Sequence, residues 1–238
     1  MVTPPQRRIG VALSMPRLAF TDNMLCMAVF VQMGINICRV GGAYWDQAIT
    51  RGFQKLVEMG HDYIITVDYD SLFDASQVTS LINLMETSGA DAIFPMQVKR
   101  NGHALMWTPM PGEPLDKSAE LSRALSGHFG LTIIRAASLA RIPQPWFWSI
   151  PSQDPASYGS WEEGSGKHDA DTAFWQLANK CGWKCYQANR IRIGHMETSV
   201  VWPGDDGPIR KTIGDFDVEG VPAECQGKQS PPSLRIAG

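Results

Sequence analysis

The N-terminal part of the chain alternates between short apolar runs and longer segments in which apolar residues recur every three or four positions. Short runs rich in β-branched residues predict strands, and the periodic segments predict helices. Strands are expected at residues 8–14, 35–40, 63–67 and 90–95, and helices at residues 22–34, 45–59 and 76–87. This alternation is typical of a parallel sheet with right-handed crossover connections.

The ends of these helices carry local signals. Asp22 is a candidate N-cap, because its carboxylate can accept a hydrogen bond from an unpaired N–H of the first turn. Gly34, Gly60 and Gly89 follow the last periodic residues of the three helices, and glycine readily adopts the left-handed conformation that ends a helix.

The second half of the chain is less regular. A Gly- and Pro-rich loop at 101–114, a helix at 115–125, a strand at 128–135, a long loop at 150–168, a helix at 171–181 and strands at 183–187 and 191–194 are expected. A loop as long as 150–168 within a compact domain indicates a functional role. We therefore expect one α/β domain over residues 1–202, followed by a Gly/Pro-rich tail, 203–238, that is mobile or lies over the domain.

The amino-acid composition bears on the binding partners and the cellular location that we expect for the chain. The chain has 238 residues and is 44% hydrophobic, as is usual for a globular protein. Its formal net charge of −3 gives no electrostatic reason to expect nucleic acid or acidic lipid as the partner, although a local basic patch can be hidden in the total. Its longest apolar run, near residues 24–31, is too short to cross a bilayer, and the N-terminus lacks the apolar core of a secretory signal. Five cysteines, an odd number, favour reduced thiols and a cytoplasmic location.

The most informative stretch is the run from Tyr63 to Asp70, where a predicted strand ends on Asp68 and Asp70. In an extended chain, residues i and i+2 face the same way, so both carboxylates can reach one point beyond the strand. Ligands of open α/β sheets bind at the carboxyl ends of strands, and hard divalent cations prefer oxygen ligands. Three Asp-x-Asp pairs occur where chance predicts about one, but only this pair follows a buried strand. The pattern indicates a metal–diphosphate site.

Three segments occur in the order typical of GT-A-fold glycosyltransferases, which transfer sugars from nucleotide diphosphate donors. The segment Tyr63–Asp70 resembles the Asp-x-Asp metal motif. Residues 127–135, with 143–147 beyond them, resemble the segment that lines the donor-sugar and acceptor side. Residues 169–184, leading to 191–195, are similar to the helix that opens with Glu-Asp and the strand that ends on a metal-binding His. The likeness is to family 2-like members.

The resemblance covers roughly residues 8–202 and implies a Rossmann-like α/β/α sandwich with a mostly parallel central sheet. It also implies that Asp70 and His195 hold a divalent ion, and that Asp68 holds the donor ribose or a metal-bound water. The imidazole ligand favours Mn²⁺ over Mg²⁺. Such an ion would neutralise the charge that grows on the departing diphosphate.

The catalytic base is less clearly marked, because Ala170 stands where the family often has Glu. Asp171 aligns best, since Phe174 then falls at the family's usual aromatic position, and Asp169 is the rival base. If the helix dipole lowers the pKa of Asp171, this residue stays ionised but becomes a weaker base. A single displacement assisted by such a base predicts inversion at the anomeric carbon.

Other residues are candidates for binding. Ser14, Gln47 and Arg51, together with Trp45, are expected to line the nucleotide pocket, because the first strand and the following helices flank it in this fold. The candidates for contact with the donor sugar or acceptor are His128, Phe129, Gly130, Trp146, Trp148 and Trp161. Aromatic faces suit sugar rings, although the same aromatics also serve as core residues.

Each of these residues also has a structural interpretation. Asp68 and Asp70 could cap a solvated turn, His195 could be a hydrogen-bonded histidine at a strand end, and Asp171 could serve as an N-cap alone. The individual candidates of the nucleotide pocket are more often structural than functional.

The resulting hypothesis is a cytoplasmic, metal-dependent glycosyltransferase of hexosyltransferase type that uses a UDP-sugar or a similar donor. Its acceptor would be a glycan, a lipid-linked sugar, a protein hydroxyl or a hydroxymethylated pyrimidine of phage-type DNA; scattered basic pairs form no strong stripe for DNA. Two alternatives remain. A nucleotidyltransferase would require a basic Gly-rich loop, which residues 14–17 match poorly, and in a non-catalytic sugar-binding module Asp171 would be dispensable.

Overall fold

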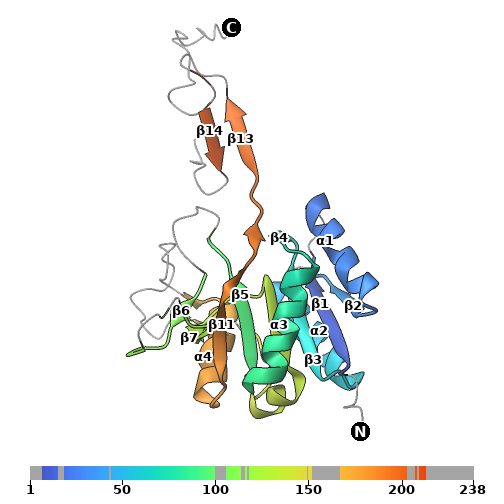
Figure 1. The fold of residues 1–238 in the computed structure, drawn as a ribbon, viewed down its shortest axis with the longest axis vertical. Coiled ribbons are helices and arrows are strands. Elements are labelled where there is room, and N and C mark those ends of the chain that lie inside the picture. The colour runs from blue at the N-terminus through green and yellow to red at the C-terminus, as the bar shows by residue number, and fades with distance from the viewer. Residues whose placement is uncertain are drawn as a thin grey trace, which may run out of the picture. The chain divides into compact units, whose positions relative to one another are not determined.

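The computed structural model describes residues 7–15, 19–42, 44–99, 106–113, 116, 118–148, 150–151, 167–202, 207 and 209–212. Its central feature is an eight-stranded sheet in the order β2-β1-β3-β8-β5-β11-β7-β6 (Figure 1). The strands are β1 Ile9–Ser14, β2 Asn36–Val40, β3 Tyr63–Asp68, β5 Ala92–Met96, β6 Thr108–Pro109, β7 Leu121–Ser126, β8 Leu131–Arg135 and β11 Cys185–Arg192.

Four α-helices accompany the sheet, α1 Thr21–Gln32, α2 Trp45–Glu58, α3 Ala75–Ser88 and α4 Ala170–Lys180, with a 3₁₀-helix, η1, at Ala136–Arg141. Three short antiparallel pairs complete the described elements. These are β4 Ser71–Leu72 with β12 Gly194–His195, β9 Ile150–Pro151 with β10 Lys167–His168, and β13 Ser199–Trp202 with β14 Ile209–Thr212.

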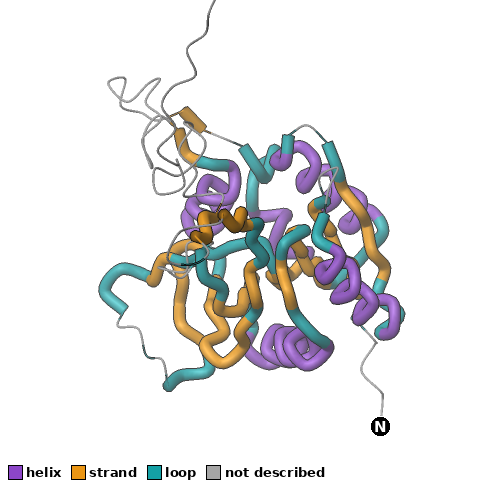
Figure 2. The backbone as a smooth tube through the Cα atoms, turned by 90° about the horizontal axis from the view of Figure 1, so that it is seen from above, coloured by secondary structure: helices purple, strands orange, loops and turns teal. Residues whose placement is uncertain are grey.

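The helices cover both faces of the sheet, so that the domain has three layers (Figure 2). On one face α1 and α3 bury residues such as Phe30 and Leu81 against the sheet. On the other face α2 and α4 bury Phe53, Phe174 and Trp175. Strand β3 serves both cores, because Ile64 packs on the second face and Ile65 on the first, as alternation along a strand requires. The α/β/α sandwich expected from the sequence is confirmed.

The sheet is mixed rather than wholly parallel. Strands β1, β2 and β3 run parallel, as do β5 and β11, but β8 lies antiparallel between β3 and β5. Strand β7 is antiparallel to both β11 and β6. The parallel direction still dominates, and β1, β3 and β5 bring their carboxyl ends to one edge of the sheet.

The helix signals act largely as expected. Asp74 caps α3 by accepting hydrogen bonds from the backbone N–H groups of Ser76 and Gln77, and Gly89 ends that helix with a φ of 64°. Asp22, however, is not the N-cap of α1: the helix begins one residue earlier, with Phe20 as its cap, and Asp22 lies in the first turn. There its negative charge still complements the helix dipole.

Two predictions from the second half of the chain are wrong. Residues 115–125 do not form a helix, because Leu121–Ser126 is the strand β7, in which Ser122 and Ala124 are buried in alternation. The two strands expected at 183–187 and 191–194 are replaced by a single long strand, β11, followed by β12. Segments this short contain too few apolar residues to distinguish the periodicity of a helix from that of a strand. Pairing with neighbouring strands decides which of the two forms.

The chain divides into two compact units, Met1–Met196 and Glu197–Gly238. The described part of the second unit contains the antiparallel pair of β13 and β14, which uses residues on both sides of position 203, the expected start of the tail. None of the described helices combines the length and the apolar character that a membrane crossing requires.

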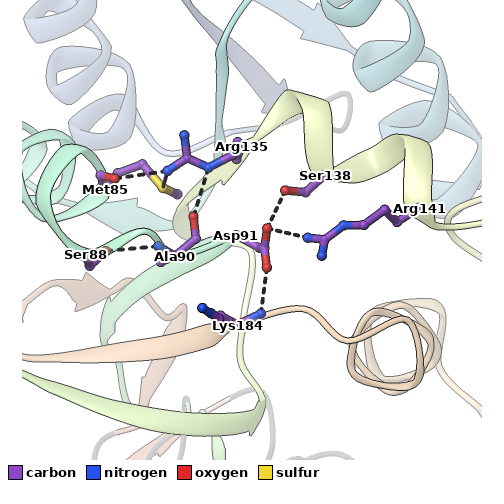
Figure 3. Close-up of polar contacts among 8 residues, drawn as sticks. All are labelled: Met85, Ser88, Ala90, Asp91, Arg135, Ser138, Arg141 and Lys184. Atoms are coloured by element: carbon purple, nitrogen blue, oxygen red, sulfur yellow. Dashed lines mark hydrogen bonds and ion pairs between the residues drawn. The ribbon is translucent and has the colours of Figure 1, made fainter.

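The edge of the sheet at which β5 begins is held by Asp91 (Figure 3). Its carboxylate accepts hydrogen bonds from the Ser138 hydroxyl, the Arg141 guanidinium and, at 2.7 Å, the Lys184 backbone N–H. Burial alone would raise the pKa of Asp91, but these hydrogen bonds outweigh burial and lower the pKa below its ordinary value of 3.8. Asp91 therefore joins η1 to the segment that leads into β11.

Replacing Asp91 by Asn should lower the free energy of unfolding by about 2–3 kcal/mol at neutral pH, because charge-assisted hydrogen bonds to a buried carboxylate are lost. A carboxyl with a depressed pKa stabilises the fold above its ordinary pKa and loses that contribution as the pH falls, so the difference should shrink below pH 3.8. Urea unfolding measures both effects. Arg141→Ala is the control: its side chain is 45% exposed, so it should cost only about 1 kcal/mol or less.

Candidate active site

The candidate site is built on the turn that follows β3 at the carboxyl edge of the sheet. Strand β3 ends at Asp68, which lies beside Ser14, the last residue of β1. The chain then turns through Tyr69 and Asp70 and enters β4, where Ser71 pairs with His195 of β12. Residues separated by more than a hundred positions are thereby brought to one point.

Hydrogen bonds to main-chain oxygens hold this turn. The side-chain amide of Asn23, a completely buried residue of α1, donates to the carbonyl oxygens of Asp68, at 3.0 Å, and Ser71, at 2.7 Å. The carbonyl of Asp70 accepts a hydrogen bond of 2.7 Å from the Met196 N–H. Both sides of the turn are thus tied to other elements, which restricts where the two carboxylates can lie.

Asp70 and His195 form the closest pair of side chains in the site. The Asp70 Oδ2 atom lies 3.3 Å from His195 Nε2, and both side chains are largely buried. The other ring nitrogen of His195, Nδ1, lies 2.9 Å from the carbonyl oxygen of Val98. A carbonyl can only accept, so Nδ1 carries the proton, and in the neutral imidazole the lone pair of Nε2 faces Asp70.

Gly130 packs closely against the residues that follow the turn. A Cβ atom at this position would come within 2.6 Å of both the Ser71 hydroxyl and the Gln97 side-chain oxygen, so no larger residue fits without movement. The Gln97 amide donates to the Ser71 hydroxyl at 3.3 Å and to the Gly194 carbonyl at 3.2 Å. Gly130 and Gln97 therefore support the strand pair that carries His195.

Negative charge is concentrated around Asp68. The pKa of this carboxyl is raised to about 7, mainly by burial and then by the nearby charges of Asp70 and Asp171, while Trp45 and His195 act in the opposite direction. Trp45, the first residue of α2, donates its indole N–H to the carboxylate. The N-terminal ends of α2 and α4 thus lie close to the same group of acids, Asp68, Asp70 and Asp171. A cation placed among these carboxylates would relieve their mutual repulsion.

The helix α4 places two acids at its N-terminus. Asp169 is the N-cap residue, and the half-buried Asp171 accepts a 2.6 Å hydrogen bond from the Thr172 N–H. Burial, followed by the charge of Asp169, raises the pKa of Asp171 despite that hydrogen bond. The loss of solvation thus outweighs the helix dipole, which by itself would lower the pKa.

His128 is enclosed within the protein. Its Nδ1 accepts from the Gly130 N–H at 3.1 Å, so Nε2 is the nitrogen that donates to the Pro95 carbonyl at 2.9 Å. Burial lowers the pKa of His128 to about 4, so the ring is neutral. Both ring nitrogens are used within the fold, and the ring braces β8 against β5.

The predicted aromatic residues lie in different environments. Phe129 and Trp146 are buried, and Phe129 packs against Trp45 with ring centroids 5.6 Å apart. Trp148 is 59% exposed. It lines a cavity of about 90 Å³ together with Trp146 and residues of α4. Trp161 lies outside the described residues.

The predicted nucleotide-pocket residues are also spread out. Ser14 is buried at the end of β1, next to Asp68. Gln47 and Arg51 lie on the exposed face of α2, and the Arg51 guanidinium is 3.4 Å from the Gly41 carbonyl. Of the four predicted residues, the structure brings Ser14 and Trp45 to the group of acids.

The pair of Asp70 and His195 can be tested as a metal site. The described residues contain no group of three or more His, Cys, Asp or Glu side chains that could hold an ion. Divalent ions in phosphate-transfer sites, however, take only one or two protein ligands and complete their shell with phosphate and water. Adjacent ligands of an octahedral ion lie about 3 Å apart, as follows from metal–ligand distances of about 2.1 Å. The separation of 3.3 Å between Oδ2 and Nε2 fits two such ligands.

Asn23 and Gln97 were not recognised from the sequence as parts of the site. Asn23 offered a signal, because it shares the buried stripe of α1 with Met27 and Phe30 and is the polar residue of that stripe. A buried amide requires hydrogen-bond partners, so its position predicts a structural contact. Gln97 follows a strand directly and offered no comparable signal.

Comparisons with known proteins show the fold. No protein-family model matches the chain, and no curated protein matches its sequence. Among solved structures, A197 from STIV is similar, with a TM-score of 0.55 and 14% identity over 80% of this chain and 86% of that one. GalNAc-T7 with UDP, GalNAc and Mn²⁺ has a TM-score of 0.52 and 10% identity over 81% of this chain and 44% of that one.

The mannosyltransferase PcManGT from Pyrobaculum calidifontis, in complex with GDP-Man and Mn²⁺, has a TM-score of 0.50 and 8% identity over 80% of this chain and 57% of that one. The chain spans about half the length of this enzyme and of GalNAc-T7. These structural similarities show that this chain has the mixed α/β fold of the GT-A glycosyltransferases, with a large and mostly parallel central sheet.

Proposed function

We propose that the chain is a metal-dependent glycosyltransferase that moves a sugar from a nucleotide-diphosphate donor, with UDP as the expected nucleotide, to an acceptor hydroxyl. One observation carries the proposal: Asp70 and His195 face each other at 3.3 Å where β3 ends, with Asp68 and the N-terminus of α4 beside them. Similar folds bind UDP or GDP-Man together with Mn²⁺.

Asp70 and His195 would hold the ion, Mn²⁺ or Mg²⁺, and Asp68 would hold the donor ribose or a water on the ion. The ion supplies Lewis-acid neutralisation of the charge that develops on the departing diphosphate. The hydrogen bond between His195 and the Val98 carbonyl supports this role, because it directs the lone pair of Nε2 towards the ion.

Asp171 would take the proton of the acceptor hydroxyl, with Asp169 as the alternative base. Asp171 is close enough to Asp68 for their charges to interact, so both reach the same small region. Its partial burial makes the carboxylate a stronger base than a solvated aspartate. A base on the face opposite the leaving group gives inversion at the anomeric carbon.

Binding of the substrates is assigned to the margins of this region. Ser14 and Trp45, with Gln47 and Arg51 further along α2, would line the side that receives the nucleotide. The exposed ring of Trp148, beside the cavity on α4, offers an apolar face for an acceptor sugar or base. We retain a glycan, a lipid-linked sugar, a protein hydroxyl and hydroxymethylated DNA pyrimidines as acceptor classes.

Release of nucleoside diphosphate from a panel of sugar nucleotides, with Mn²⁺ and with excess chelator, tests the proposed function. Metal-dependent release from one donor class supports a glycosyltransferase. Turnover of nucleoside triphosphates alone would indicate a nucleotidyltransferase, and binding without turnover a sugar-binding module.

Asp70→Asn should weaken Mn²⁺ binding at least ~100-fold, because loss of a direct ligand costs no less than loss of an outer-shell partner. Isothermal titration with Mn²⁺ and UDP measures this change. Asp22→Asn, at an exposed acid in the first turn of α1, is the matched control and should bind Mn²⁺ like the original chain. Equal Mn²⁺ affinity in both variants would remove Asp70 from the metal site.

Asp171→Asn should reduce sugar transfer by about 10²–10⁴-fold, the usual contribution of a general base, while the affinity for the donor stays unchanged. Steady-state kinetics and donor titration separate the two effects. Asp169→Asn, at the neighbouring acid, should transfer at a nearly normal rate. If the rates of the two variants are reversed, the base is Asp169.

Asn23→Ala should weaken Mn²⁺ binding about 10-fold, because the turn that carries Asp70 loses both side-chain hydrogen bonds. The matched control is Cys26→Ala, on the same helix, which removes a sulfur contact to the Phe73 N–H just beyond the turn. Thermal unfolding is recorded for both variants. If Cys26→Ala weakens Mn²⁺ binding as much as Asn23→Ala does, the effect is one of general stability.

A further inference from the structure

Exposed apolar side chains gather on one margin of the domain. Ten large apolar residues of the described chain are exposed, and half of them belong to α1, β2 and the short connection between them. These are Met24, Leu25, Val31, Met33 and Ile37. In Figure 1 both elements lie at the outer margin of the sheet, where β2 is the terminal strand.

The outer side of α1 is unusual for a solvated helix. Its only charged residue is Asp22, in the first turn, whereas a surface helix normally carries charges along its solvent face. Met24, Ala28 and Val31 are exposed and follow one another at helical spacing, so they form a single apolar stripe.

The direction of this stripe follows from the opposite flank of the helix. There Cys26 accepts a 3.5 Å hydrogen bond from the Phe73 N–H, in the segment that leads into α3. The stripe lies across the helix from Cys26, so it faces away from α3 and towards the margin beyond β2, the terminal strand of the described sheet.

At the same margin, no described strand pairs with the outer edge of β2. The Val40 carbonyl accepts a 3.1 Å hydrogen bond from the Met15 N–H, so the backbone groups of Val40 point towards β1. Because these groups alternate along a strand, those of Ile37 and Arg39 point outwards. Cys38 and Val40 pack into the core on the α2 side, which places the side chains of Ile37 and Arg39 on the α1 side.

We propose that a second copy of this chain covers this surface, with the two β2 strands paired antiparallel about a two-fold axis at Cys38. Ile37 of each copy then pairs with Arg39 of the other, and both residues have their N–H and C=O groups directed outwards, as a hydrogen-bonded pair requires. The two α1 stripes lie on the same face of the extended sheet and approach each other above the new strand pair. The contact is isologous and closed.

The charges favour a second copy over other occupants. The last turn of α1 contains no basic residue, although a cation is favourable there. The paired strands place Arg39 of the second copy beside Ile37, close to that end of α1. An anionic lipid surface would require Lys or Arg along the helix, and α1 has none.

Sedimentation velocity tests the dimer at protein concentrations up to about 0.1 mM, where even a weak specific contact is populated. Val31→Lys should raise the dissociation constant at least ~10-fold, equal to about 1.4 kcal/mol. The added cation suits the last turn of α1, so the monomer should remain folded. Val57→Lys, in the last turn of α2, is the matched control and should leave the dimer intact.

Oxidative cross-linking tests the register. In a non-hydrogen-bonded antiparallel pair the two Cys38 Cα atoms lie about 4.5 Å apart, within the range of a disulfide. A cross-linked dimer that forms through Cys38 and is lost in Cys38→Ser supports the proposal. A monomeric chain at all concentrations, open-ended oligomers, equal effects of the two lysine variants, or a cross-link that persists in Cys38→Ser would overturn it.

Discussion

The side-chain amide of Asn23 reaches from α1 to two carbonyl oxygens, those of Asp68 and Ser71, and thereby spans the turn on which the site is built. Met196 holds the same turn through the Asp70 carbonyl, and the pairing of β4 with β12 places His195 opposite Ser71. Without these contacts, nothing in the order of the chain would keep the carboxylate of Asp70 at 3.3 Å from an imidazole more than a hundred residues away. The position of the acids follows from main-chain hydrogen bonds.

This arrangement has an electrostatic cost. The charge of Asp68 interacts with those of Asp70 and Asp171 in a largely buried region, and the pKa of Asp68 rises to about 7 as a result of burial and these neighbours. A structure without a function at this place would gain stability by replacing one of the acids. Strongly perturbed carboxyl groups that gather at the end of a sheet are typical of functional sites. Trp45 and His195 offset part of the repulsion, and a divalent ion would offset more.

Much of the fold could be predicted because local patterns determine it. The bounds of α2 and α3 are predicted to within one residue by the periodic apolar residues of the two helices and by the glycine after α3. Strand β7 was missed because its few apolar positions fit either a helix or a strand. The antiparallel position of β8 depends on how all the strands are ordered in the sheet, and no local sequence pattern specifies that order.

For the site, the Asp-x-Asp pair identifies the turn, whereas the supporting roles of Gln97 and Gly130 depend on contacts between distant segments. The raised pKa of Asp171 could not be predicted from the sequence, because the burial that raises it cannot be read from the position of the residue in the helix.

The central claim is that Asp70 and His195 share one divalent ion. Anomalous diffraction at the manganese absorption edge, from crystals grown with Mn²⁺ and a nucleoside diphosphate, tests it directly. The account predicts a single strong peak within about 2.0–2.3 Å of both the Asp70 carboxylate and His195 Nε2, with diphosphate oxygens completing the shell. A fully bound nucleotide whose manganese lies elsewhere, with Asp70 and His195 still in direct contact, would contradict it.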